Sequence, residues 1–217
     1  MASPSPSPSL EPPSLRVEQI VTATRSLFLR YGYRRTSVDD IAREAGVAKA
    51  TLYLHFDGKD DMFRTMIRHF RAVMDARCDD AEASSGPVQV RIVGLLYARY
   101  GTALEWFGDA AHISELKAFV AENPIGPLDE TSPAFHDRLR RLLREAADRG
   151  ELDPSRQSVT LQEVAQSLLF AADGAKRMQK NGAEGLRRAL EAVTILVLAG
   201  LRPVATARPP GGGQGRS

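Results

Sequence analysis

The chain has 217 residues, 43% of them hydrophobic, which is enough apolar material for a sizeable core in one or two domains. A formal net charge of +2 excludes a globally basic surface of the ribosomal or histone kind, so any contact with nucleic acid needs a local patch. The single cysteine, Cys78, excludes an intramolecular disulfide framework and is typical of a reducing compartment.

The two ends of the chain have compositions that cannot form a core. Residues 1–14 alternate serine and proline, and residues 203–217 are rich in glycine and proline, so we interpret both as disordered tails. The first segment also lacks the basic and apolar regions of a secretory signal. The most apolar run, 192–201, is about half of the ~20 residues that a membrane-spanning helix needs. We therefore expect a cytoplasmic protein with no membrane association.

Between the tails, apolar residues recur at helical spacing and strand-like alternation never persists, so the predicted fold class is all-α. The first helix is predicted over 15–31, with Gly32 as its stop. Its apolar face is formed by Ile20, Ala23, Thr24, Leu27 and Phe28.

Residues 37–56, SVDDIAREAGVAKATLYLHF, have the pattern of two short helices joined by a tight turn. Ser37 is a favourable N-cap, and Asp40 adds a carboxylate to the first turn, where a helix favours negative charge. Gly46 suits the left-handed conformation that ends a helix. Two apolar side chains of the second helix face back toward the first, Leu52 and Phe56. This pattern predicts a DNA-reading helix-turn-helix.

Further helices are predicted at about 60–81, 88–107, 112–122, 133–149, 158–180 and 183–201, with glycine or proline at the breaks. The last two are so apolar that they need burial on more than one side. Either the last helix is central to its own domain, or the pair forms a four-helix interface with a second copy, which we favour. The predicted dimer-interface residues are Leu161, Leu168, Leu169, Leu190, Val193 and Val197.

A dense set of motif positions surrounds the helix-turn-helix: Phe28, Tyr31, Gly32, Tyr33, Thr36, Ser37, Val38, Ile41, Ala42, Ala45, Gly46, Val47, Lys49, Thr51, Leu52, Tyr53, His55, Phe56, Lys59, Met62 and Phe63. In order and spacing they resemble the DNA-binding domain of the tetracycline-repressor (TetR) family over about residues 14–74. The resemblance implies a DNA-binding domain over 15–75, with its helix-turn-helix at 37–56. It also implies a helical domain over 76–202 that dimerises and often contains a small-molecule pocket.

The predicted DNA contacts follow from the side of the second short helix that Leu52 and Phe56 leave free. A recognition helix presents its N-terminal, outward side chains to the major groove. These are Lys49, Ala50, Thr51, Tyr53, Leu54 and His55. Lys49 suits a phosphate or guanine, whereas Ala50 and Leu54 suit a thymine methyl group. The family resemblance implies phosphate contacts for Tyr53 and His55 and, outside this helix, for Thr36 and Lys59.

Each of these assignments has a structural alternative. Lys49 and Lys59 would then be solvated charges, and Tyr53 would pack in the core with only its hydroxyl exposed. Residues 16–75 contain eleven Lys and Arg against eight Asp and Glu, a local charge of only +3. One copy would therefore bind DNA weakly, and a dimer would place two recognition helices on half-sites roughly 34–36 Å apart.

Aromatic and methionine side chains cluster in the middle of the chain, where they would line an apolar effector pocket. For each of them the alternative is an ordinary helical core. The candidate ligand-binding residues are Tyr97, Tyr100, Trp106, Phe107, His112, Phe119, Phe170 and Met178.

The leading hypothesis is a dimeric repressor that binds a palindromic operator in double-stranded DNA and is released by a small apolar effector. One alternative retains DNA binding without a ligand, under the control of a partner or constitutively. A remote alternative is an enzyme that uses the helical C-terminal domain, but no catalytic residues, cofactor or metal site are expected from the sequence.

Overall fold

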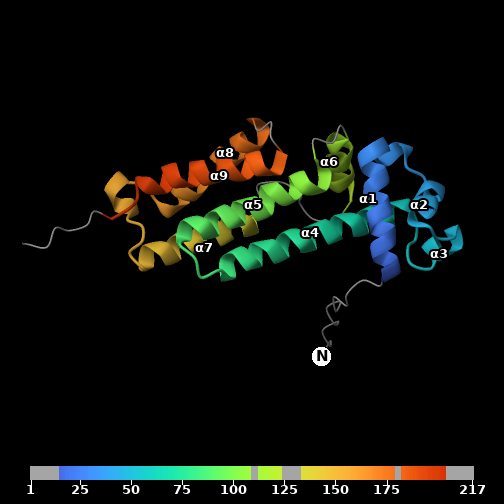
Figure 1. The fold of residues 1–217 in the computed structure, drawn as a ribbon, viewed down its shortest axis with the longest axis horizontal. Helices are drawn as coiled ribbons and strands as arrows, with labels where there is room; N and C mark the ends of the chain where they lie inside the picture. The colour runs from blue at the N-terminus through green and yellow to red at the C-terminus, as the bar shows by residue number, and fades with distance from the viewer. Residues whose placement is uncertain (1–14, 109–111, 124–132, 179–181, 204–217) are drawn as a thin grey trace, which may run out of the picture. The chain divides into compact units, whose positions relative to one another are not determined.

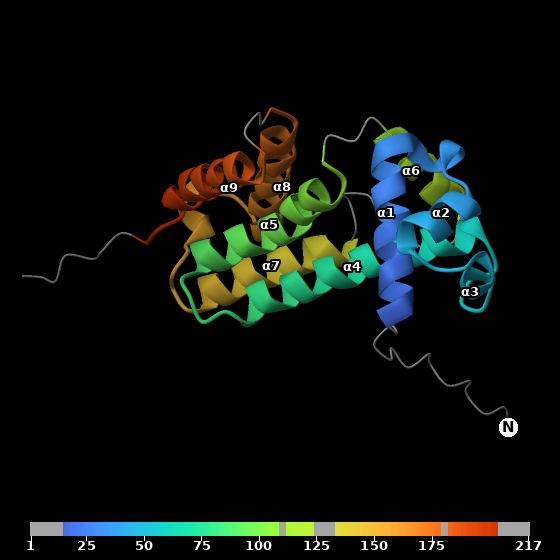
Figure 2. The same ribbon diagram turned by 45° about the vertical axis from the view of Figure 1, so that its right-hand side comes forward.

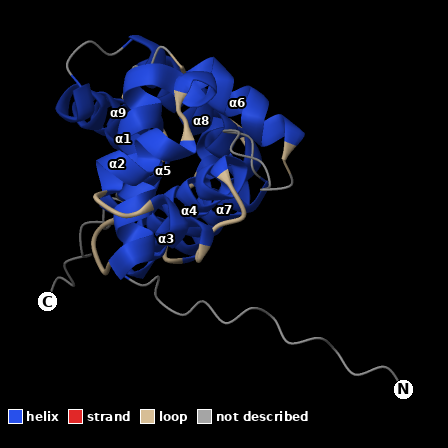
Figure 3. Cartoon of the chain, turned by 90° about the vertical axis from the view of Figure 1, so that its right-hand side faces the viewer, coloured by secondary structure: helices blue, strands red, loops and turns tan. Residues whose placement is uncertain are grey.

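The computed structural model describes residues 15–108, 112–123, 133–178 and 182–203, and each secondary-structure element within these ranges is a helix (Figure 3). The predicted all-α fold class is confirmed. The helices are α1 (Leu15–Arg35), α2 (Val38–Ala45), α3 (Lys49–Tyr53), α4 (Lys59–Ala83), α5 (Val88–Phe107), α6 (Ile113–Glu122), α7 (Pro133–Asp148), the 3-10 turn η1 (Pro154–Gln157), α8 (Leu161–Met178) and α9 (Gly182–Ala199). The predicted tails, 1–14 and 204–217, lie outside the described residues.

The chain forms two compact units. Unit 1 comprises Met1–Ala76 and Ala103–Glu130, and unit 2 comprises Arg77–Thr102 and Thr131–Ser217. Helices α4 and α5 therefore each contribute residues to both units. Unit 1 also contains α6, which the sequence assigned to the second domain, so α6 belongs to the same compact body as the helix-turn-helix.

Unit 1 has two apolar clusters, and α1 contributes residues to both. The first contains Ile20, Leu27, Ile41, Ala42, Leu52, Phe56 and Met62, and it joins α1 to α2, α3 and the start of α4. The second contains Val21, Phe28, Phe63, Met66, Ile67, Phe70, Met74, Phe107, Leu116 and Phe119. It joins α1 to α4, the end of α5 and α6, which Figures 1 and 2 show near α1. The packing of both clusters therefore depends on α1.

In unit 2, α9 packs along α8, and α8 packs on α7 (Figure 1). Fully buried leucines from α5, α7, α8 and α9 build its core: Leu95, Leu96, Leu139, Leu143, Leu168 and Leu190. Each lies on the apolar face of its helix, which is the pattern expected of helices that pack together.

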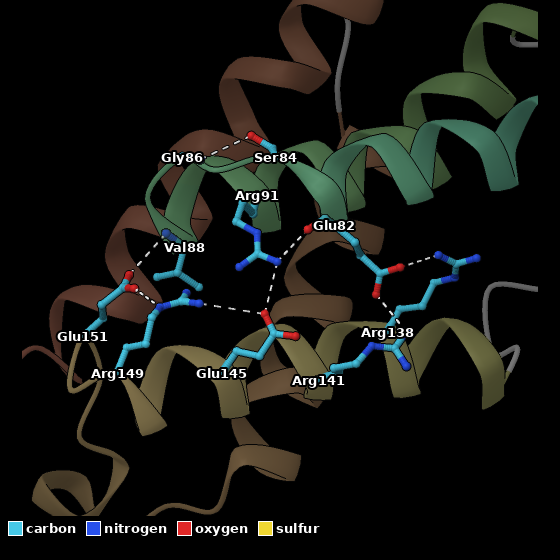
Figure 4. Close-up of polar contacts among 10 residues, drawn as sticks. All are labelled: Glu82, Ser84, Gly86, Val88, Arg91, Arg138, Arg141, Glu145, Arg149 and Glu151. Carbon is cyan, nitrogen blue, oxygen red and sulfur yellow. Dashed lines mark hydrogen bonds and ion pairs between the residues drawn. The ribbon is translucent and has the colours of Figure 1, made fainter.

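A charged network closes the α4–α5 end of unit 2 (Figure 4). The Arg91 side chain, only 10% exposed, donates to the Glu82 carbonyl at 2.6 Å and to the Glu145 carboxylate at 3.1 Å. Arg91 belongs to α5. Two arginines of α7, Arg138 and Arg141, form ion pairs with the Glu82 carboxylate. A partly buried arginine needs such partners, and the network links α7 to α4 and α5.

Several helix ends differ from the prediction by a few residues, and three of them lie at turns. Helix α1 continues past a non-helical kink at Gly32 to Arg35, and α3 ends at Tyr53 rather than His55. Helix α8 starts at Leu161 rather than 158, and Ser158, which follows η1, is in the left-handed conformation (φ 53°). Local turn geometry of this kind leaves little trace in apolar periodicity.

Candidate nucleic-acid interface

Helix α2 is bounded at both ends as its sequence predicts. The Asp40 amide donates to the Ser37 hydroxyl at 3.1 Å, and the Ser37 amide donates to the Asp40 carboxylate at 3.2 Å, which completes a capping box. The Ser37 hydroxyl also donates to the Asp40 carboxylate, and this bond, followed by the one from the Ser37 amide, lowers the pKa of Asp40 below its ordinary value. At the other end Gly46 is left-handed (φ 66°). The predicted N-cap and stop are confirmed, and together they fix where the turn to α3 begins.

Helix α3 is anchored by one side and exposes the other. Leu52 is 0% exposed and Phe56 is 5% exposed, as predicted, whereas Tyr53 is 52% and Leu54 81% exposed. Thr51 is half-buried. Three more predicted contacts are also exposed, Lys49, Ala50 and His55. A charged, an aromatic and two small or apolar side chains therefore project together from one short helix, which is what base and phosphate contacts in a major groove require.

Lys49 has an ion-pair partner within the protein. Its ammonium lies 2.9 Å from the Asp39 carboxylate of α2, and the hydrogen bond to Asp39 raises the pKa of Lys49. The pair keeps Lys49 charged and joins α2 to α3. A phosphate or base that binds Lys49 competes with Asp39.

The environment of Thr36 contradicts its predicted phosphate contact. Thr36 is 2% exposed, and its hydroxyl donates to the Gly32 carbonyl at 2.8 Å. Its one hydroxyl proton is used inside the protein, so Thr36 shapes the backbone before α2 instead of facing solvent. The neighbouring Ser37 is exposed, but its amide and its hydroxyl both donate to the Asp40 carboxylate, so it serves as the N-cap of α2.

Lys59 begins α4 and contacts the segment before α2. Its ammonium donates to the Tyr33 carbonyl at 3.1 Å and lies 4.2 Å from the centre of the Tyr33 ring. The Tyr33 hydroxyl donates to Asp60, and burial followed by this carboxylate raises the pKa of Tyr33. An ammonium has three donors, so Lys59 retains capacity for a phosphate while it ties α4 to the residues that precede α2.

The eight predicted ligand-binding residues are divided between the units. In unit 1, Phe107 and Phe119 are core residues, with Trp106 packed against them, and His112 lies beside Phe28. In unit 2, Tyr100 is buried and Tyr97 half-buried. The prediction of cavity-lining positions is wrong for Phe170 and Met178, which are 70% and 82% exposed on α8.

Two hollows among the described residues have charged walls. One, in unit 1, is lined by Leu27, Arg30, Tyr31, Arg35, Asp40, Arg43 and Glu44. The other, in unit 2, is lined by Glu82, Ala83, Ser84, Ser85, Gly86, Arg91, Glu145, Arg149 and Glu151 (Figure 4). Neither has the apolar lining expected for an effector pocket.

The predicted dimer-interface residues also require correction. Leu168, Leu169 and Leu190 are at most 4% exposed within the single chain, so they belong to its own core. The other three are half-buried: Leu161, Val193 and Val197. The apolar side chains that α8 and α9 do expose are Phe170, Met178, Ile195 and Leu196. Apolar periodicity identified which helices need burial, but not which of their side chains the same chain already covers.

Within the described ranges, no group of His, Cys, Asp and Glu side chains is arranged to bind a metal ion. Across the same residues, no helix combines the length and apolarity that crossing a bilayer requires.

The N-terminal part of the sequence matches a known protein family. Residues 20–66 match the profile of bacterial regulatory proteins of the tetR family. The chain is 27% identical over 140 residues to the HTH-type transcriptional repressor KstR2 of Rhodococcus jostii (strain RHA1), a match covering 62% of this chain and 66% of that protein. It is 32% identical over 82 residues to KstR2 of Mycobacterium tuberculosis (strain ATCC 25618 / H37Rv), covering 38% and 41%. These matches span less than two thirds of each relative's length.

Solved structures share the fold over most of the chain. A TetR transcription regulator from Haloarcula marismortui superposes with a TM-score of 0.63 at 18% identity, covering 87% of this chain and 98% of the other. The fatty acid degradation regulator FadR from Bacillus halodurans gives 0.59 at 20% identity, covering 88% and 99%. The ketosteroid transcriptional regulator KstR2 of Mycobacterium tuberculosis gives 0.58 at 20% identity, covering 88% and 97%.

Proposed function

We propose that this chain, whose residues 20–66 match the tetR family of bacterial regulatory proteins, is a dimeric transcriptional repressor. In this proposal it binds a palindromic operator in double-stranded DNA. The observation that carries the proposal is the exposed face of α3 and of the turn after it, where Lys49, Tyr53 and His55 project beside the buried Leu52. Its relatives are transcriptional regulators, and we propose no enzymatic activity for it. A cytoplasmic location follows from this role.

A second copy supplies the affinity that one DNA-binding domain lacks. Residues 16–75 carry a local charge of only +3, so a single DNA-binding domain releases few counterions from DNA and binds weakly. We propose that α8 and α9 pair with the same helices of the second copy through Phe170, Met178, Ile195 and Leu196. These large side chains expose between 45% and 82% of their surface, which burial in an interface would remove from water.

The test of DNA binding starts from duplexes that the wild-type protein selects from a random-sequence pool; we call the selected sequence the operator duplex. Replacing Lys49 and Tyr53 together by alanine is expected to abolish retention of this duplex in a gel-shift assay. Lys117→Ala, which removes an exposed lysine of α6, is the control and should retain it. Sedimentation should show that both variants remain dimers. Full retention by the double variant would contradict the proposal.

We further propose that a small apolar effector releases the repressor from DNA. The features of unit 2 that support this are two tyrosines of α5 with basic side chains above their rings. Arg187 lies 4.0 Å from the Tyr97 ring centre, and Lys176 lies 5.8 Å from that of Tyr100. An apolar molecule with an acidic or carbonyl group would suit such surroundings.

The effector proposal is tested with compounds chosen from the regulators of similar fold. A fatty acid and a ketosteroid are the first choices. FadR is a regulator of fatty acid degradation, and KstR2 is a ketosteroid transcriptional regulator. An effector should raise the melting temperature and release the operator duplex at the same concentration. Release by a protein partner, or by nothing, would favour the alternative without a ligand.

A further inference from the structure

The kink in α1 brings its backbone close to α6. Gly32 has φ 79° and ψ 171°, a conformation that glycine adopts readily and other residues do not. A Cβ atom at this position would lie 2.8 Å from both Glu115 Oε1 and His112 Nδ1. Two conditions therefore require glycine here, the backbone angle and the approach of two side chains from the first turn of α6.

Glu115 binds the backbone that follows the kink. Its Oε2 accepts a hydrogen bond from the Arg34 amide at 3.2 Å, and its Oε1 lies 3.3 Å from His112 Nδ1. The amide of Arg34, followed by the neighbouring His112, lowers the pKa of Glu115, so the carboxylate is ionised at neutral pH. A charge-assisted hydrogen bond to a backbone amide is among the stronger ones in proteins.

The same stretch of backbone leads directly into the helix-turn-helix. We call residues 32–37 the junction, because they join the kink of α1 to the N-cap of α2. Within it, Thr36 donates to the Gly32 carbonyl, and Lys59 from the start of α4 donates to the Tyr33 carbonyl. The junction is therefore tied to α4 by Lys59 and to α6 by Glu115, and only two residues lie between Arg34 and the Ser37 cap.

We propose that Glu115 is a positioning residue for DNA binding: by binding the Arg34 amide it fixes the path of the junction and thereby the orientation of α2 and α3. The inference rests on the proposed function, since it concerns how well α3 fits an operator. It gives α6, which lies outside the matched residues 20–66, a direct influence on the DNA-reading helices. His112 acts through Glu115, because it orients the carboxylate.

The test compares three variants of the full chain: Glu115→Ala, Glu115→Gln and the control Glu122→Ala. Glu122 is an exposed carboxylate on the same helix, so its removal measures the general effect of one lost negative charge. That effect alone strengthens DNA binding, because it reduces repulsion of phosphates. The positioning role predicts the opposite sign. Glu115→Ala should bind the operator duplex about tenfold or more weakly, and Glu115→Gln, which keeps one acceptor, should lie between it and wild type.

Two further readouts separate positioning from a general structural role. Affinity for a scrambled duplex should stay at the level of the Glu122→Ala control, so the ratio of operator to scrambled affinity falls. Hydrogen exchange should accelerate at the amides of residues 33–45 in Glu115→Ala and remain slow in Glu122→Ala. An equal loss for both duplexes, or unchanged operator affinity, would overturn the proposal.

Failure of the proposed function has a different signature. If the wild-type chain selects no sequence from the pool, repression of an operator is contradicted, while hydrogen exchange still reports on the contact. Unchanged exchange at residues 33–45 in Glu115→Ala would overturn the positioning role in that case as well.

Discussion

In the proposed complex Asp39 competes with DNA for Lys49, so its removal should strengthen operator binding. The two charged groups lie 2.9 Å apart, with side chains that are 63% and 50% exposed. An exposed ion pair of this kind opposes the release of its lysine by a factor of about 1.5–5. In a dimer, the Lys49 of each chain must separate from its Asp39 when both DNA-binding domains bind, so the factor applies twice. Asp39→Asn should therefore raise operator affinity about two- to twenty-five-fold.

The measurement is fluorescence anisotropy with the operator duplex at low salt, where exposed charges are least screened. The matched control is Asp75→Asn, which removes an exposed carboxylate about 24 Å farther along α4 than Lys59. This control should change affinity much less. The advantage of Asp39→Asn should disappear when Lys49 is also replaced by alanine, because the gain acts through that lysine. A weaker complex, or a gain that persists without Lys49, would show that Asp39 does not compete with DNA for this lysine.

Three further predictions concern stability and assembly. Leu52→Ala, at a fully buried site beneath α3, should lower the free energy of unfolding by about 2–5 kcal/mol in urea titrations; a loss below about 1 kcal/mol would contradict its anchoring role. The pKa of Asp40 is lowered in the folded state by Ser37, so its contribution to stability is present above its ordinary pKa and is lost as pH falls through the lowered value; Asp40→Asn should flatten that part of the pH–stability profile. Leu196→Asp, at a side chain 74% exposed on α9, should shift sedimentation from dimer to monomer with little change in circular dichroism, and an intact dimer would exclude this face.

Helix positions were largely predictable from the sequence because local chemistry determines them. Ser37 and Asp40 form the expected capping box, and Gly46 takes the expected left-handed conformation. Both features depend on a few neighbouring residues, so the sequence contains the necessary information. The inward side of α3 was predictable for the same reason, since Leu52 and Phe56 fall at helical spacing.

Features that depend on distant parts of the chain were not predictable in this way. Periodicity shows that Leu168 and Leu190 need burial, but not whether the cover comes from the same chain or a second copy. Likewise the motif did not show that the Thr36 hydroxyl is used by the Gly32 carbonyl. The contact of Glu115 with the Arg34 amide joins residues far apart in the sequence, and no local pattern marks it.

Selection of duplexes from a random pool with the wild-type chain examines sequence-specific DNA binding and dimerisation together. A dimeric repressor should enrich an inverted repeat whose half-sites are centred roughly one helical turn, ~34–36 Å, apart. The Lys49 and Tyr53 double variant should enrich no sequence from the same pool. A pool that stays random with the wild-type chain, or a single half-site bound by a monomer, would contradict the proposed function.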